Sequence, residues 1–226
     1  MKTTKIKFQK PAFVVLVAIF LSLCLNAQSV KDINGKTYKT VKIGQKEWMA
    51  QNLDVACFRN GDSIPHAATP EEWQEAGASG KPAWCYYNNS DSIGSIYGKL
   101  YNYFAITDPR GLAPAGWHIP SNADWTATTK FLGGVDLAGN KMKCTSGWSN
   151  KNKGNNKSGF CGLPGGFRDE KGKFSNVNQM SLWWSVDKLM REPSQIYTLK
   201  LKEAFGEVFY DTADSKSGLS VRVVKD

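Results

Sequence analysis

Residues 116–125 read Gly-Trp-His-Ile-Pro-Ser-Asn-Ala-Asp-Trp. The first half of this stretch is typical of a short extended segment. Ser121 followed three residues later by Asp124 indicates a helix start at which each side chain caps the backbone of the other residue. We therefore predict a helix over 122–132. Its expected buried residues are Trp125 with Phe131 or Leu132, and its expected end is Gly133-Gly134.

Turn signals and alternating apolar residues predict strands on both sides of this helix. Asn34-Gly35 is typical of a tight hairpin turn, and the β-branched run 37–43 follows it. Alternation over 196–202 indicates a half-buried strand. The other predicted strands are 46–53, 166–169, 182–186, 207–211 and 219–224. Further helices are predicted over 70–76 and 97–106, and the rest of 58–96 and 140–159 is expected to be loop.

The N-terminus carries four lysines and then an apolar run that ends at Leu25. This pattern predicts a signal peptide over 1–27, cleaved after Ala27. Lipid attachment at Cys24 is the alternative, although the preceding Leu23 is large for that processing. The mature chain, 28–226, is then expected to be a single α+β domain that is secreted, periplasmic or on the cell surface.

The formal net charge of the chain is +9, but the leader lysines supply four of these charges and leave +5 for the mature chain. The remaining lysines are scattered, which is typical of a solvated surface. No basic stripe alternates with aromatic residues, so nucleic acid is not an expected partner. The expected contact with a membrane is through the signal peptide or the Cys24 lipid.

Four cysteines remain after removal of Cys24, and an even count in an exported chain indicates disulfides. Sequence alone allows three pairings of these four residues. We predict Cys57–Cys85 and Cys144–Cys161, because each pair closes a turn-rich loop of modest length. No closely spaced Cys/His cluster indicates zinc, and no metal or cofactor is expected.

Signatures of catalysis are weak. Ser185 and Lys188 match a Ser-x-x-Lys pattern, but the companion motifs are missing. The chain has two histidines, His66 and His118. His118 stands between apolar residues at the start of a helix, where a structural role is the stronger interpretation. We expect no catalytic residue.

Five segments resemble, in order, the Fibrobacter succinogenes major paralogous domain family. They are residues 41–53, 97–102, 116–125, 163–168 and 218–222. The resemblance implies a C-type-lectin-like fold, in the branch shared with formylglycine-generating enzymes. Two main helices would pack on small twisted antiparallel sheets, with the termini close together and long ordered loops on one face.

The resemblance also marks departures in this chain. Val223 and Val224 stand where family members often carry a cysteine, and no cysteine follows Cys161. Formylglycine-type oxidation needs a reactive cysteine pair in that part of the fold, so this activity is not expected. Cys144 and Cys161 are unusual for the family and are interpreted as a local staple.

Aromatic residues have two possible roles, in the core or at a ligand site. Trp48, Trp117 and Trp125 are predicted to be core residues. Only one of Trp183 and Trp184 is expected to join them, because neighbours on a strand face opposite sides. The turn-forming residues near Asn88 match no calcium motif of sugar-binding lectins and are better interpreted as a loop. The candidate ligand-binding residues are Trp84, Tyr86, Tyr87, Asn88 and Asp91.

These observations predict a non-catalytic recognition or adhesion module that binds a glycan or an extracellular protein. Contacts are expected from loops at 84–93, 186–194 and 211–217. A structural component of the cell envelope without a ligand site is the first alternative. An enzyme with His66 or His118 beside a carboxylate in a deep pocket is the second.

Overall fold

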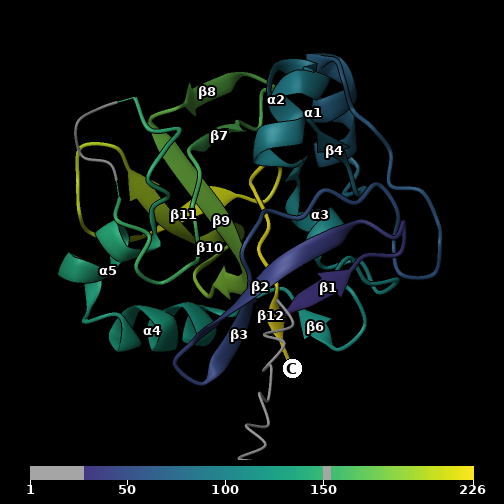
Figure 1. Ribbon diagram of the computed structural model, residues 1–226. Coiled ribbons are helices and arrows are strands. Elements are labelled where there is room, and N and C mark those ends of the chain that lie inside the picture. The colour runs from purple at the N-terminus through teal and green to yellow at the C-terminus, as the bar shows by residue number, and fades with distance from the viewer. Residues whose placement is uncertain (1–27, 150–153) are drawn as a thin grey trace, which may run out of the picture.

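The computed structural model describes residues 28–149 and 154–226 (Figure 1). The predicted signal peptide and Cys24 lie outside these residues. Two five-stranded sheets and a set of short helices form a mixed α+β architecture. Within the described residues, no helix has the length and apolar character needed to cross a membrane.

The first sheet is antiparallel and holds both ends of the described chain, in the order β1-β2-β3-β12-β6 (Figure 1). The Asn34-Gly35 turn joins β1 to β2, as predicted. The predicted strand 37–43 matches β2 residue for residue. The strands are β1 (Ser29–Lys31), β2 (Thr37–Ile43), β3 (Lys46–Met49), β12 (Val224–Lys225) and β6 (Trp117–His118).

The second sheet has the order β11-β10-β9-β7-β8, and a two-stranded sheet pairs β4 with β5. Within the second sheet the neighbouring strands are antiparallel, except that β7 and β9 pair in parallel at Gly166 and Ser181. The strands are β7 (Gly165–Arg168), β8 (Phe174–Val177), β9 (Met180–Leu189), β10 (Glu192–Lys202), β11 (Phe209–Asp214), β4 (Trp84–Cys85) and β5 (Leu100–Tyr101).

The helices lie around these sheets and are short. The predicted capping of α4 is present, because Ser121 Oγ accepts a hydrogen bond from the Asp124 backbone N–H while the Asp124 carboxylate accepts one from the Ser121 N–H. The helices are α1 (Pro70–Ala78), α2 (Asp91–Tyr97), α3 (Tyr103–Ile106), α4 (Asn122–Phe131) and α5 (Val135–Met142), with a 3-10 turn at Tyr87–Asn89. Leu132 is buried at the end of α4, whereas Phe131 is 65% exposed.

The predicted helix over 97–106 is wrong. Gly98 adopts a φ of +75° and lies against the backbone of Leu53, so the helix ends there. Leu100 and Tyr101 then pair with β4. The Asn102 side chain accepts from the Ala105 N–H and starts the separate helix α3. Tertiary contacts therefore divide a stretch whose apolar spacing alone suits one helix.

Two other predictions also need correction. Both Trp183 and Trp184 are fully buried, because β9 is an inner strand with a core cluster on each face. Trp184 packs in the cluster with Leu53 and Tyr101, and Trp183 packs in the one with Trp48 and Trp125. The predicted strand 219–224 is regular only at its end. Before that, Leu219 and Ser220 form single bridges that connect the sheets.

Two helical glycines test how tightly the helices pack. A Cβ on Gly139 in α5 would lie 2.3 Å from the Glu207 carbonyl oxygen, whereas one on Gly77 in α1 would meet the Lys216 side chain at 3.0 Å. Gly139→Ala should lower the free energy of unfolding by roughly 1–3 kcal/mol, because rigid backbone cannot move aside. Gly77→Ala should change it by less than about 1 kcal/mol, since the gain in helix propensity opposes the tight contact. Urea unfolding of both variants measures the difference, and equal effects would contradict the packing of α5.

Candidate functional site

A fully buried arginine, Arg222, connects segments that are far apart in the sequence. Its guanidinium donates to the carbonyls of Met49, Phe160 and Cys161 at 2.6–2.9 Å. It also donates to Asn52 Oδ1 at 2.7 Å. Backbone carbonyls buried at this junction would otherwise lose their hydrogen bonds, at a cost of about 1–3 kcal/mol each. Arg222 is therefore first a structural residue.

A second buried arginine, Arg168 of β7, has a similar environment. It donates to the carbonyls of Gly172, Ala67 and Ala68. Its guanidinium also lies over the rings of Trp73 and Phe174, 4.8 and 4.7 Å from their centroids. These contacts join α1 to the second sheet.

The predicted aromatic site is an internally bonded cluster rather than an exposed platform. The His66 ring stacks on Trp84 with centroids 4.2 Å apart. The Lys99 ammonium lies over the same ring at 4.4 Å and donates to the Tyr86 hydroxyl. The His66 ring and the Lys99 ammonium are both too close to the centre of the Trp84 ring to share one face, so they lie on opposite faces of it. Both faces of Trp84 are therefore covered by the protein itself.

The remaining residues of the predicted site differ in exposure. Tyr87 is buried against Phe174, so the three aromatics are not exposed together. Gly94 of α2 packs against the Tyr86 ring, which fixes that side chain from one side. Asn88 and Asp91 are exposed. As ligand contacts these two remain a prediction.

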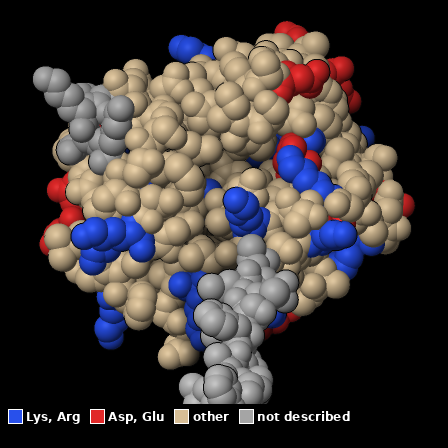
Figure 2. Space-filling view, viewed as in Figure 1, with Lys and Arg blue, Asp and Glu red and all other residues tan. Residues whose placement is uncertain are grey.

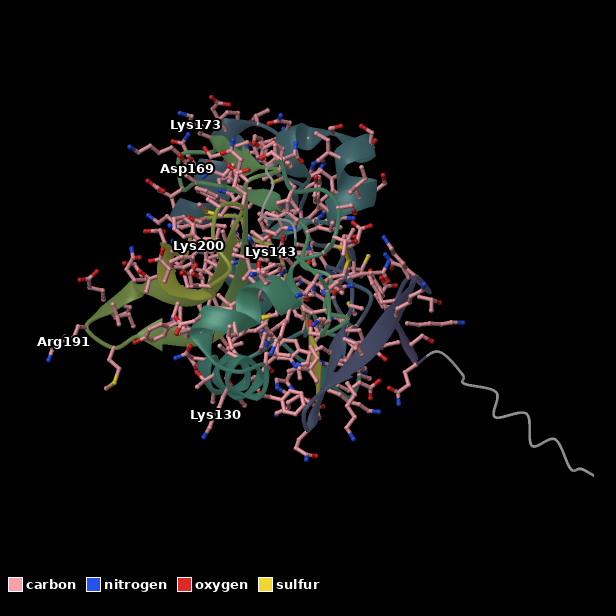
Figure 3. All side chains as sticks on the ribbon, turned by 60° about the vertical axis from the view of Figure 1, so that its left-hand side comes forward. Lys130, Lys143, Asp169, Lys173, Arg191 and Lys200 are labelled. Atoms are coloured by element: carbon pink, nitrogen blue, oxygen red, sulfur yellow. A yellow bond between two sulfur atoms is a disulfide. The ribbon has the colours of Figure 1, made fainter. Side chains whose placement is uncertain are left out.

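A cleft of about 290 Å³ opens on the face of the second sheet, where the predicted 211–217 region meets residues that the sequence did not single out. Its apolar floor is Phe167, Met180 and Ala213, which are partly buried and pack on the core beneath. Asp169 and Lys200 lie on the same side of the molecule (Figure 3). The polar residues around this floor are Asp169, Glu170, Asn176, Lys200, Asp211, Thr212 and Ser217.

The polar groups of the cleft are held in place by local contacts. Lys200 of β10 forms an ion pair with Asp211 of β11. Burial alone would raise the pKa of Asp211, but the hydrogen bond from Lys200 lowers it below its ordinary value. Asp169 accepts from the Lys171 and Lys173 N–H groups and so fixes the turn after β7. The cleft therefore presents ordered carboxylates beside an apolar surface.

The predicted 186–194 region forms the end of the β9–β10 hairpin. This hairpin projects from the body of the molecule, with Arg191 at its tip (Figure 3). Met190 beside it is 94% exposed. The hairpin tip lines none of the cavities described here.

His118 lies between two carboxylates. Its Nδ1 is 2.6 Å from Asp226 and its Nε2 is 3.3 Å from Asp124. Burial would raise the pKa of Asp124, but hydrogen bonds from Lys46, Ser121 and His118 lower it overall. Since the same Asp124 caps α4, these contacts tie the C-terminal residue to the start of that helix.

Of the two predicted disulfides, Cys144–Cys161 is present. The predicted Cys57–Cys85 bond is wrong, because both cysteines are free. Cys85 packs in one core cluster with Trp73 and Leu100. Val55 and Phe58, which flank Cys57 in the sequence, belong to a different core cluster. Burial raises the pKa of the Cys85 thiol to about 12. Within the described residues no group of three or more His, Cys, Asp or Glu side chains is placed to hold a metal ion.

Thiol labelling tests this cysteine arrangement in a chain of residues 28–226. At pH 8, Cys57 is expected to react with iodoacetamide slowly in the folded protein, because it is half-buried. Cys85 should react only after unfolding, since its thiol stays protonated and inaccessible. Mass spectrometry of the unfolded, unreduced chain should find labels at these two positions and none at Cys144 or Cys161. Absence of label from Cys57 and Cys85 would show that they are paired after all.

Residues 41–225 fit the model of the Fibrobacter succinogenes major domain. No match was found among curated proteins or among solved structures. The matched range runs from β2 to β12 and includes both buried arginines and the sheet cleft. The chain therefore belongs to the Fibrobacter succinogenes major domain family.

Proposed function

We propose that this chain is an exported, non-catalytic recognition or adhesion module that binds a glycan in the cleft of the second sheet. The main supporting observation is that one cleft combines a half-buried apolar floor, with a single aromatic residue, Phe167, and fixed carboxylate, amide and hydroxyl groups. Sugar rings present apolar C–H faces and many hydroxyls, so they suit an apolar surface that is edged by hydrogen-bonding groups.

The charges of the cleft indicate which class of glycan it would bind. Asp169, Glu170 and Asp211 face a single ammonium, that of Lys200, which Asp211 already pairs. A further anion would meet uncompensated negative charge there. The expected ligand is therefore a neutral or amino-substituted glycan rather than an acidic one.

The proposal replaces the aromatic loop with the cleft as the main contact surface. Trp84 has both faces covered and Tyr87 is buried, so neither supports stacking on a sugar. Asn88 and Asp91 stay available as secondary contacts. Without the cleft, the same observations would favour a structural component of the cell envelope.

A C-type-lectin-like fold, related to the formylglycine-generating-enzyme branch, is part of the same proposal. Three features support it. Both ends of the described chain lie in one sheet, the strands are short and mostly antiparallel, and the two longest helices, α1 and α4, flank the sheets (Figure 1). Export rests on the N-terminal sequence pattern. The chain has no cysteine after Cys161, which argues against formylglycine-type oxidation.

Binding of the mature chain to an array of neutral, amino and acidic glycans tests the proposed function. Neutral or amino glycans should be retained, and Phe167→Ala should weaken their binding about tenfold, or roughly 1.4 kcal/mol. Glu170→Gln should change the preference for amino sugars, because one carboxylate of the cleft is lost.

Two matched variants control for general effects. Tyr210→Ala removes an exposed aromatic from β11 outside the cleft, and Glu192→Gln removes a carboxylate from the start of β10. Both should bind like the unmodified chain. Equal losses for Phe167→Ala and Tyr210→Ala, or no glycan bound at all, would reject the cleft as the site and favour the structural alternative.

A further inference from the structure

A second cavity, of about 230 Å³, lies between the start of β2, helix α2 and the segment that follows Cys161. It shares no residue with the sheet cleft. Figure 2 shows a face that is hollowed near its centre, below α2, with Lys and Arg atoms at the hollow. The residues that matter here are Lys36, Gln51, Asn52, Ser95 and Arg222, all of which line the cavity.

The cation in the wall of this cavity has no counter-charge within the chain. Arg222 is 1% exposed, and its four hydrogen bonds go to three backbone carbonyls and the neutral Asn52 side chain. All 20 acidic residues of the chain lie in the described part, and none forms an ion pair with Arg222. One of the five N–H groups of the guanidinium has no partner among the described residues.

A buried charge without an opposite charge is costly. Carbonyl dipoles reduce this cost but leave the net charge in place. In agreement, burial lowers the pKa of Arg222 to about 9. An anion in the cavity would oppose that shift, because an opposite charge nearby favours the charged form.

Further positive charge and a free donor lie near the cavity. Lys36 and Lys99 both pair with the same carboxylate, that of Asp54, at 2.5 and 2.7 Å. Two cations therefore share one anion. The Gln51 side chain accepts from the Lys39 N–H through its oxygen, which leaves its amide N–H₂ without a partner among the described residues.

We propose that this cavity binds the carboxylate of a small acidic ligand, such as a uronic acid, between the Arg222 guanidinium, the Lys36 ammonium and the Gln51 amide. The one remaining N–H of Arg222 can donate a charge-assisted hydrogen bond to a carboxylate oxygen. One N–H of Arg222, two of Lys36 and two of Gln51 remain, which can serve both oxygens of a carboxylate, whereas a phosphate would divide them among more oxygens. The site is distinct from the sheet cleft in position and has the opposite charge preference.

Isothermal titration of the mature chain with sodium glucuronate tests the site, with glucose and sodium chloride at matched ionic strength as comparisons. Glucuronate should bind in a saturable way and raise Tm, whereas glucose and chloride should not. Acetate should compete with glucuronate at higher concentration, because it supplies the same carboxylate with fewer other contacts. Inorganic phosphate binding as tightly as glucuronate would overturn the assignment to carboxylates.

Two variants probe the cavity without altering Arg222. Lys36→Gln should weaken glucuronate binding at least fivefold, because it removes one cation from the cavity. Ser95→Trp, on the exposed side of α2, should abolish binding by filling the cavity, with Tm of the free protein nearly unchanged. Lys39→Gln is the matched control, since Lys39 is an exposed lysine of β2 outside the cavity.

Equal affinities for Lys36→Gln and Lys39→Gln, or absence of saturable binding by the unmodified chain, would overturn the proposal. Loss of glycan binding by Phe167→Ala with glucuronate binding intact would separate this site from the proposed function.

Discussion

The hydrogen bonds of the buried Arg222 side chain hold together the parts of this fold that carry the sheet cleft and the Arg222 cavity. One guanidinium reaches the end of β3 at Met49, the residues Phe160 and Cys161 of the disulfide-closed loop, and Asn52. Asn52 in turn accepts from the Trp183 indole and donates to the Tyr97 carbonyl, which extends the network to β9 and α2. Only arginine offers five N–H donors in a fixed planar arrangement, so no other side chain could satisfy these groups together.

The same arrangement explains why two cavities of opposite character lie in one small domain. On the face of the second sheet, the carboxylates of Asp169, Glu170 and Asp211 surround an apolar floor. At the junction of the sheets, Arg222 brings a positive charge that no carboxylate of the chain neutralises. The hydrogen bonds that Arg222 makes to the backbone place its charge beside a cavity. Lys36 and Lys99, which both pair with Asp54, add further positive charge nearby. A recognition role in which the two cavities take chemically different groups is consistent with this distribution of charge.

Sequence patterns predict the parts of this molecule that follow local rules. The Ser121–Asp124 capping pair and the β2 strand depend on neighbouring residues, and both predictions are confirmed. The predicted helix over 97–106 is wrong because contacts with residues distant in the sequence set the conformation there. Gly98 packs against the backbone of Leu53, and the Asn102 side chain accepts a hydrogen bond from the Ala83 N–H. The residues that line the cleft come from several strands between β7 and β11. The sequence could not predict which of them lie together, because that depends on the register of the strands. The sequence analysis did not single out Arg222, although an isolated charge among the valines of 219–224 is the feature that could have indicated the central network.

Hydrogen exchange of arginine side chains, followed by NMR on ¹⁵N-labelled protein, tests the central role of Arg222 most directly. Because its donors are buried and bonded, the Nε–H of Arg222 should exchange far more slowly than that of the exposed Arg191. Arg168 should be the other strongly protected arginine. An Arg222 Nε–H that exchanges as fast as that of Arg191 would show that the guanidinium is not held at this junction, and would contradict the account.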